Sequence, residues 1–247
     1  MKNTTILFTT FLFLNCFSCK EQTKQEVTAP PPIKEKEILI ESPQPVPEKM
    51  KPPTIDYDTT QWAEILFDKE GILVDMKYAT EDNFVKEKMY NCGRCFLRPE
   101  VAEALIKAQK ILEDKNLGLK VYDCYRPRPV QKLLWKKVPN ASYVTPPSKG
   151  SMHNRGTAVD LTLVDAHGKA LEMGTIFDFF GKRAHHDYTD LPEEILNNRL
   201  LLKETMKKVG FLPIRTEWWH YYYAHRAPAG HELSDYLWPC DSLEEGI

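Results

Sequence analysis

The hydrophobic pattern divides the chain into an irregular leader and a long region of periodic segments. From residue 71 onwards, apolar side chains recur at every second position in some segments and at helical spacing in others. Period-two segments predict half-buried strands, and helical spacing predicts helices with one buried face. The strands are expected at 71–78, 119–123, 158–164 and 217–223, and the helices at 98–115, 130–137 and 191–209.

Residues at the segment ends and the order of the segments predict the fold class. Pro99 stands at the start of the 98–115 segment and Gly118 follows its end, as is typical of helix boundaries. Strands and helices mix without the regular strand–helix–strand alternation that a parallel sheet requires. The sequence therefore predicts an α+β fold: a single domain, residues 55–247, with a central antiparallel β-sheet flanked by helices.

The first 18 residues have the features of a bacterial export signal. Lys2 precedes an apolar stretch at 6–14, which is too short to span a membrane permanently. Cys19 follows the small residue Ser18 and precedes a polar run, so it resembles the lipid-modified cysteine of bacterial lipoproteins. We expect residues 1–18 to be a lipoprotein-type signal peptide and Cys19 to carry the lipid. Plain secretion with cleavage nearby is the alternative.

Residues 19–54 have the composition of a tether between the lipid and the folded domain. Eight of the 18 prolines lie between Pro30 and Pro53, no glycine occurs before Gly71, and 20–53 contains no aromatic residue. Such a segment cannot bury enough apolar surface to offset the entropy of ordering it, so it is expected to be disordered. The location predicted is the bacterial envelope, on the periplasmic side, with the lipid anchor as the only membrane contact.

Charge and cysteine content restrict the class of protein further. The 33 basic and 35 acidic residues leave a net charge of -2, whereas nucleic-acid-binding proteins normally carry a basic excess, so no nucleic-acid partner is expected. Beyond the leader, four cysteines can pair in three ways in an exported protein: Cys92, Cys95, Cys124 and Cys240. The only CxxC motif has no partner motif, which favours disulfides or structural thiols over a zinc knuckle.

Two histidine-containing clusters can supply metal ligands. His153 lies in a polar loop, and Asp160 lies within an apolar strand, where an unpaired carboxylate would be costly. A zinc ion would supply the missing partner; a salt-bridged Asp160 beside a stray histidine is the simpler alternative. In the second cluster, His220 can provide a third ligand and Glu217 a general base. On a regular strand these two residues would face opposite sides unless a bulge or turn intervenes, and a structural histidine in an aromatic strand is the alternative.

A third cluster surrounds Arg126, which lies between Tyr125 and Pro127 at the end of a predicted strand. A guanidinium group in this position can donate two hydrogen bonds to a carboxylate or to a developing oxyanion. An arginine in a structural salt bridge is the alternative interpretation.

Taken together, these motifs resemble the zinc D,D-peptidase family, which includes D,D-carboxypeptidases and VanX-type D-alanyl-D-alanine dipeptidases. The resemblance rests on the pattern S-x-H-x-x-G-x-A-x-D at 151–160, followed by E-x-W-H at 217–220. Segments at 77–80, 123–127 and 173–178 resemble the dipeptidase branch in particular. The similarity extends from about Ile55 to about Trp238, nearly the whole predicted domain.

The resemblance implies a role for individual residues. Three of them correspond to the ligands of one zinc ion per chain: His153, Asp160 and His220. Glu217 corresponds to the general base that activates a zinc-bound water, and Arg126 to the group that stabilises the tetrahedral intermediate. Three more correspond to the substrate-binding residues: Asp178 and Tyr78, which contact the substrate's ammonium group, and Ser151, which lies near the bound dipeptide. Tyr90 and Cys92 stand near the position of a second pocket tyrosine.

The function that the resemblance implies is zinc-dependent hydrolysis of D-alanyl-D-alanine to two D-alanines, in cell-wall peptide metabolism. A D,D-carboxypeptidase or another peptidoglycan peptidase is the alternative within the same class, but an acid at Asp178 suits a free ammonium group. From another class, the alternative is a non-catalytic zinc-containing binding module. The presence of both Glu217 and Arg126 argues against it, because such a module has no use for a base beside a metal.

Overall fold

The structure, a computed structural model, describes residues 55–224 and 231–240. The predicted signal peptide, Cys19 and the predicted tether lie outside these residues. Within the described part, no helix combines the length and the apolar character needed to cross a membrane.

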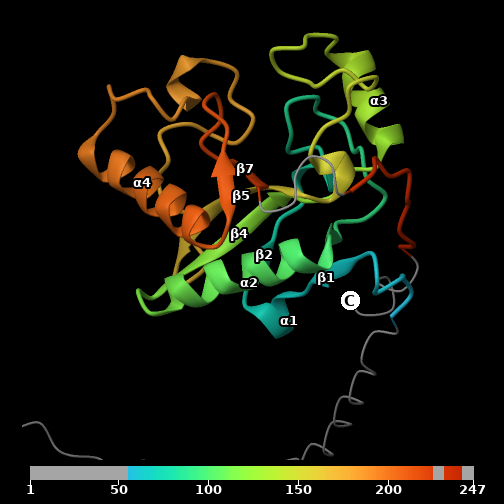
Figure 1. Cartoon of the computed structure of the whole chain (residues 1–247). Helices are drawn as coiled ribbons and strands as arrows, with labels where there is room; N and C mark the ends of the chain where they lie inside the picture. Colours follow the sequence, from blue (N-terminus) through green and yellow to red (C-terminus); the bar gives the residue numbers. More distant parts are fainter. Residues whose placement is uncertain (1–54, 225–230, 241–247) are drawn as a thin grey trace, which may run out of the picture. The chain divides into compact units, whose positions relative to one another are not determined.

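A five-stranded sheet forms the centre of the domain (Figure 1). Its strands, from one edge to the other, are β2 (Leu73–Val74), β4 (Leu117–Asp123), β5 (Ala158–Asp165), β7 (His220–Tyr223) and β6 (Phe211–Pro213). Neighbouring strands are antiparallel except at the first edge, where β2 pairs with β4 in parallel. A separate antiparallel pair consists of β1 (Ala63–Ile65) and β3 (Cys95–Leu97).

Two long helices cover one side of the sheet. In Figure 1, α2 (Pro99–Glu113) and α4 (Glu193–Lys208) lie together against the sheet, and α3 (Arg128–Lys137) lies apart from both of them, at the upper right. The remaining helical segments are short: α1 (Phe67–Glu70) and the 3-10 turns η1 (Lys77–Ala79), η2 (His153–Arg155) and η3 (Lys182–Ala184).

Helix α2 confirms the periodic pattern of the sequence. The apolar positions of its predicted buried face are fully buried: Val101, Leu105, Ala108 and Leu112. Pro99 occupies the first turn, where its missing N–H costs no hydrogen bond. Buried Gln109 accepts a hydrogen bond of 2.8 Å from the backbone N–H of Leu119, which ties the helix to β4.

The predicted strands and helices agree with the structure except at two places. The predicted strand 71–78 is wrong in its second half, because after β2 the chain turns into η1 and buries Tyr78. The predicted central antiparallel sheet is confirmed, with one parallel pair at this edge, where β2 runs parallel to β4. The predicted strand 217–223 begins only at His220, because a turn at 215–216 precedes it.

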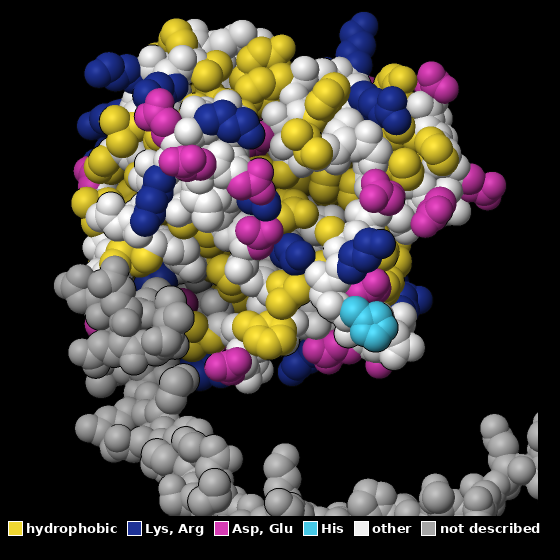
Figure 2. Space-filling view, turned by 180° about the vertical axis from the view of Figure 1, so that it is seen from behind, with side chains coloured by type: hydrophobic (Ala, Val, Ile, Leu, Met, Phe, Trp, Pro, Cys, Tyr) yellow, Lys and Arg dark blue, Asp and Glu magenta, His cyan; other side chains and the backbone are white. Residues whose placement is uncertain are grey.

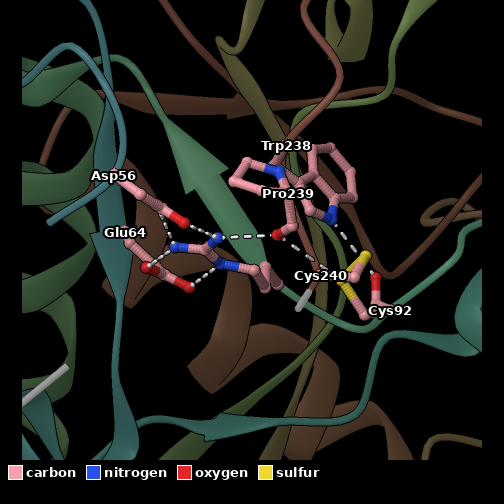
Figure 3. The surroundings of a disulfide bond; sticks show 7 residues. Asp56, Glu64, Cys92, Trp238, Pro239 and Cys240 are labelled. Atoms are coloured by element: carbon pink, nitrogen blue, oxygen red, sulfur yellow. Dashed lines mark hydrogen bonds and ion pairs between the residues drawn. A yellow bond between two sulfur atoms is a disulfide. The ribbon is translucent and has the colours of Figure 1, made fainter. Parts of the chain in front are cut away.

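Two disulfides select one of the three possible cysteine pairings. Cys95–Cys124 joins β3 to the residue after β4, and Cys92–Cys240 fixes the end of residues 231–240, the C-terminal strap. Figure 3 shows the second disulfide beside Trp238, whose indole N–H donates a hydrogen bond of 3.4 Å to the Cys92 carbonyl.

A buried arginine next to this disulfide fastens the strap to the first residues of the domain. Arg94 forms ion pairs with Asp56 at 3.0 Å and Glu64 at 2.7 Å, and it donates a hydrogen bond of 2.9 Å to the Pro239 carbonyl (Figure 3). Because the arginine is 5% exposed, these bonds are needed to compensate the loss of its hydration. The two ends of the described domain are therefore held at one place.

Charges of both signs are interspersed on the face seen from behind (Figure 2). Lys and Arg side chains lie close to Asp and Glu side chains, with apolar groups between them. This face of the described residues therefore presents no extended basic area of the kind that binds a nucleic-acid backbone.

Candidate active site

Three side chains from separate segments converge at one end of the sheet. His153 lies in η2, Asp160 in β5, and His220 at the first position of β7, opposite Asp160 in the strand register. The Asp160 Oδ1 atom is 2.9 Å from His220 Nδ1 and 3.3 Å from His153 Nε2. The two histidine nitrogens are 3.1 Å apart, and all three residues are buried.

The chemistry of this group fits a zinc ion. One potential ligand atom from each residue lies within 4.8 Å of the others. Two imidazole nitrogens and a carboxylate oxygen are ordinary zinc ligands, and three protein ligands leave a coordination position open, as catalytic sites require. Burial alone would raise the pKa of Asp160, but the adjacent His153 and His220 hold it well below its ordinary value. The carboxylate is thus kept in the charged form that binds a cation.

The backbone fixes which nitrogen of His153 faces the group. His153 Nδ1 lies 2.7 Å from the carbonyl oxygen of Cys124, and a carbonyl can only accept, so Nδ1 carries the hydrogen. Nε2, the other ring nitrogen, is therefore the one that faces Asp160 and His220 and that a metal ion would bind. A carbonyl acceptor on the other ring nitrogen is the usual partner of a histidine that binds a metal.

The glycine of the motif allows this turn to pack closely against the domain. Gly156 ends η2 with φ +72°, a left-handed conformation that favours glycine. A Cβ atom there would lie 2.6 Å from the ring of Trp62. Gly156 also accepts a hydrogen bond of 3.0 Å from the backbone N–H of Arg98. The turn that presents His153 is therefore anchored at its end to the start of α2.

Glu217 lies in the irregular segment between the turn at 215–216 and β7, not in the strand. As a result its Oε2 atom comes within 4.0 Å of His220 Nδ1, although a regular strand would place the two side chains on opposite faces. The pKa of Glu217 is raised to about 7, chiefly because the carboxyl group is buried; His220 and Arg126 lower this pKa and Asp160 raises it. A carboxyl group with a pKa near neutrality can both accept and release a proton under working conditions.

Arg126 is held rigidly on several sides. Its Nε and Nη2 atoms donate hydrogen bonds of 3.0 and 2.6 Å to Asp123 Oδ2, and Nη1 donates one of 3.0 Å to Gln131. The guanidinium carbon lies 4.9 Å from the centre of the Tyr78 ring. Tyr90 donates a hydrogen bond of 2.7 Å to the second carboxylate oxygen of Asp123. Arg126 thus has one orientation, fixed before any substrate arrives.

Asp178 and Tyr78 form a buried acid–phenol pair. The Tyr78 hydroxyl donates a hydrogen bond of 2.8 Å to Asp178 Oδ2. Asp178 has φ 56°, a left-handed conformation that costs on the order of 1 kcal/mol for a residue other than glycine. Burial raises the pKa of Asp178 well above its ordinary value, and Asp160 raises it further. A carboxyl group in this environment would be stabilised by a cation such as an ammonium group.

Ser151 supports the turn that carries His153. The Ser151 hydroxyl oxygen accepts a hydrogen bond of 3.2 Å from the backbone N–H of His153. The serine also lines the same cavity as the groups described above. Its hydroxyl group is therefore next to the space available to a ligand.

A single cavity of about 450 Å³ is lined by all eight site residues predicted from the sequence. They are Tyr78, Arg126, Ser151, His153, Asp160, Asp178, Glu217 and His220. Apolar walls are provided by Phe84, Leu134 and Val144. The structure therefore brings every predicted site residue into one space, while the role of each in catalysis or binding stays a prediction.

The residues that position the site side chains through hydrogen bonds are not among those predicted from the sequence. Asn154, which is fully buried, donates a hydrogen bond of 2.7 Å to the Arg126 carbonyl and accepts one of 2.8 Å from the backbone N–H of Ser151. Its own carbonyl accepts a hydrogen bond of 2.9 Å from Ser234 of the C-terminal strap. Asp123 could have been found from its place beside Arg126 in the same motif. Asn154 gave no such signal, because a polar residue in a polar loop is ordinary.

Comparison with known proteins gives a consistent set of relatives. A family model described as D-Ala-D-Ala dipeptidase matches residues 58–236. The chain is 39% identical over 164 residues to a D-alanyl-D-alanine dipeptidase of Escherichia coli (strain K12), covering 66% of this chain and 85% of that protein. It is 34% identical over 172 residues to a D-alanyl-D-alanine dipeptidase of Enterococcus faecium, covering 61% of this chain and 85% of that protein. A solved structure of the D,D-pentapeptidase VanY in complex with Zn(II) aligns with a TM-score of 0.37 and 16% identity, over 52% of this chain and 73% of that chain.

Proposed function

The chain belongs to the D-Ala-D-Ala dipeptidase family and is a zinc-dependent peptidase, and on this basis we propose that it hydrolyses free D-alanyl-D-alanine to two D-alanines. The observation that carries the proposal is one cavity that combines the group His153, Asp160 and His220 with a buried acid, Asp178, and a carboxyl of raised pKa, Glu217. These are the parts that hydrolysis of a small zwitterionic peptide requires.

His153 Nε2, Asp160 Oδ1 and His220 Nδ1 are the atoms that would hold the zinc ion. When bound, zinc supplies Lewis-acid chemistry: it polarises a carbonyl group and lowers the pKa of a water molecule towards neutrality. The protein's own contribution is to keep Asp160 charged and to hold His153 in one tautomer.

Asp178 and Tyr78 bind the free amino end of the substrate in this proposal. Burial disfavours the charged form of Asp178 because it removes the hydration of the carboxylate. The positive charge of an ammonium group would compensate this loss of hydration. The Tyr78 hydroxyl, 2.8 Å away, keeps the carboxylate in position. A peptide with a blocked or extended amino end would lack the charge that matches this pair, which favours a dipeptidase over a carboxypeptidase.

Glu217 moves the protons. Its carboxyl group faces the cavity beside His220, where it would take a proton from the attacking water and pass one to the leaving amine. Arg126, held by Asp123 and Gln131, faces the same cavity and would stabilise the negative charge that develops on the carbonyl oxygen. A non-catalytic binding module would need neither group.

A location in the bacterial envelope is also part of the proposal. The leader with Cys19 supports export and lipid anchoring, and the residues from 19 to 54 would serve as a tether. Two disulfides support export independently, because structural disulfides persist in oxidising compartments and are rare in the cytosol. Cell fractionation tests the location: recovery of the native protein in the cytosolic fraction would contradict it.

The activity is tested with two substrates and the purified zinc-loaded domain. Free D-alanyl-D-alanine should be hydrolysed efficiently, and a muramyl pentapeptide ending in D-alanyl-D-alanine should release little D-alanine. Release of D-alanine from the pentapeptide alone would replace the dipeptidase assignment by a carboxypeptidase. If neither substrate were hydrolysed by the zinc-loaded protein, the proposal would fail.

A further inference from the structure

A second cavity adjoins the site and has no part in the function proposed above. Its volume is about 290 Å³, and four aromatic side chains form part of its wall: Tyr143, Phe179, Phe180 and Trp219. Tyr143 and Glu217 line both this cavity and the first one. These two side chains therefore stand between the two spaces.

The ring of Tyr143 is held in place by aromatic contacts from another loop. Tyr143 follows α3, and its ring stacks on Phe180, with centroids 4.3 Å apart and an interplanar angle of 23°. Phe180 in turn packs edge-on against Phe84, which lines the first cavity, at 5.0 Å. Tyr143 is 44% exposed and Phe180 38% exposed, so the pair lies at the surface rather than in the core. Its removal would leave the packing of the sheet intact.

The chemistry of the proposed reaction orients a peptide relative to this pair. The amino end lies at Asp178 and Tyr78, in the first cavity. The leaving amine receives its proton from Glu217, so the residue after the cleaved bond lies next to Glu217. Because Glu217 and Tyr143 line both cavities, the second cavity is the adjacent space for anything attached to the carboxyl side of that residue.

We propose that Tyr143, braced by Phe180, sets the length limit of the substrate by blocking the path of a third residue into the second cavity. This inference rests on the proposed dipeptidase function. Without the ring, the two cavities would join, and the exposed Lys182 on the wall of the second cavity could pair with the terminal carboxylate of a tripeptide. Water would then add across the first peptide bond of D-alanyl-D-alanyl-D-alanine, releasing D-alanine and D-alanyl-D-alanine.

The test compares hydrolysis of D-alanyl-D-alanine with hydrolysis of D-alanyl-D-alanyl-D-alanine by the zinc-loaded full-length enzyme. The wild type and Tyr143→Phe, which keeps the ring, should share a strong preference for the dipeptide. Tyr143→Ala should raise kcat/KM for the tripeptide at least about tenfold relative to the dipeptide, since loss of a blocking group changes discrimination on this scale. Phe180→Ala, which removes the brace, should shift the ratio in the same direction by a smaller factor.

Each outcome separates this inference from the proposed function. An unchanged ratio in Tyr143→Ala would overturn the inference, provided that circular dichroism and zinc content match the wild type. If Tyr143→Ala does not fold, the same ratio is measured for Phe180→Ala, and an unchanged ratio in that variant would overturn the inference. A wild type that cleaves the tripeptide as well as the dipeptide would also overturn it while leaving the dipeptidase activity established. A wild type inactive on the dipeptide would instead refute the proposed function.

Discussion

His153 Nδ1 donates a hydrogen bond of 2.7 Å to the carbonyl oxygen of Cys124, and the side chain of Cys124 is cross-linked to Cys95. A covalent bond between β3 and the end of β4 therefore fixes the acceptor that orients a metal-binding histidine. Cys124 and Cys95 are both fully buried, so this bond lies inside the domain, next to the site. The other disulfide, Cys92–Cys240, fastens the C-terminal strap and has no such contact with His153.

The two disulfides should consequently differ in their effect on metal binding. Replacing both Cys95 and Cys124 by alanine should lower zinc affinity about tenfold or more, the usual effect of disturbing a partner of a metal-bound histidine. It should also lower the free energy of unfolding by about 2–5 kcal/mol. Replacing Cys92 and Cys240 is the matched control, with a loss of stability but an unchanged zinc affinity. Competition with a chelator measures the affinity; equal losses in both variants would contradict the link.

Glu217→Gln should remove catalysis and leave the metal site intact. The glutamine has nearly the same shape but cannot carry a proton between water and the leaving amine, so kcat should fall by about 10³-fold. Zinc content should stay at one ion per chain, because Glu217 is not among the three residues expected to bind the metal. Turnover comparable to the wild type would remove Glu217 from the role of base.

His153→Ala should lower the zinc content of the purified protein. The substitution removes one nitrogen from the three-residue group and leaves Asp160 and His220 as the only expected ligands. Asp165→Ala at the half-buried end of β5 provides a control acid outside the cavity. Metal analysis after dialysis measures the change, and one zinc per chain in His153→Ala would exclude this histidine as a ligand.

The metal-free protein should be less stable at pH 8 than at pH 5 because of Glu217. Burial raises the pKa of this carboxyl from 4.5 to about 7 in the folded state, so the folded protein binds the proton more tightly than the unfolded chain does. The resulting stabilisation is fully present below the pKa of Glu217 in the unfolded chain, and it is lost as the pH rises through about 7. Between pH 5 and pH 8 the free energy of unfolding should therefore fall by about 2 kcal/mol. Urea unfolding in the presence of EDTA measures it. The Glu217→Gln variant should show a pH dependence smaller by that amount, and an identical pH dependence would contradict the prediction.

Asp178→Asn should weaken recognition of the amino end of the substrate. Loss of the buried charge should lower kcat/KM for D-alanyl-D-alanine by about 10²-fold, the cost of leaving an ammonium group without its partner. The wild type should discriminate strongly against N-acetyl-D-alanyl-D-alanine, which has no ammonium group, and Asp178→Asn should lose most of that discrimination. If both enzymes discriminated equally, Asp178 would not be the ammonium-binding residue.

The long periodic segments could be predicted from the sequence because burial alone determines them. Helix α2 and strand β5 agree with their predicted ranges to within two residues at each end. Strand β2 could not be predicted in the same way. Its alternating pattern continues to Tyr78, but that side chain is buried beneath Arg126, a contact with a segment far away in the chain.

The composition of the site could also be predicted, but not the groups that orient it. Residues that act on a ligand have distinctive chemistry and stand in recognisable motifs, as His153 and Glu217 do. Residues that orient them act through tertiary hydrogen bonds, such as those of Asn154 to Arg126 and Ser151, and such bonds leave no pattern in the sequence. The sequence predicts either a regular strand through Glu217 and His220 or a bulge or turn between them, because it does not show where a strand begins. In the structure β7 begins at His220, and Glu217 lies before it.

The strand register has a consequence for how the domain assembles. Asp160 lies opposite Asp123 of β4 on one side and opposite His220 of β7 on the other, so the site spans three adjacent strands. His153 lies in the turn just before β5, whereas His220, 67 positions further along the chain, lies opposite Asp160 only when β7 pairs with β5 in this register. A shift of one residue in that docking would turn His220 to the opposite face of the sheet. A metal ion that needs all three residues would therefore stabilise the correctly registered sheet relative to a shifted one.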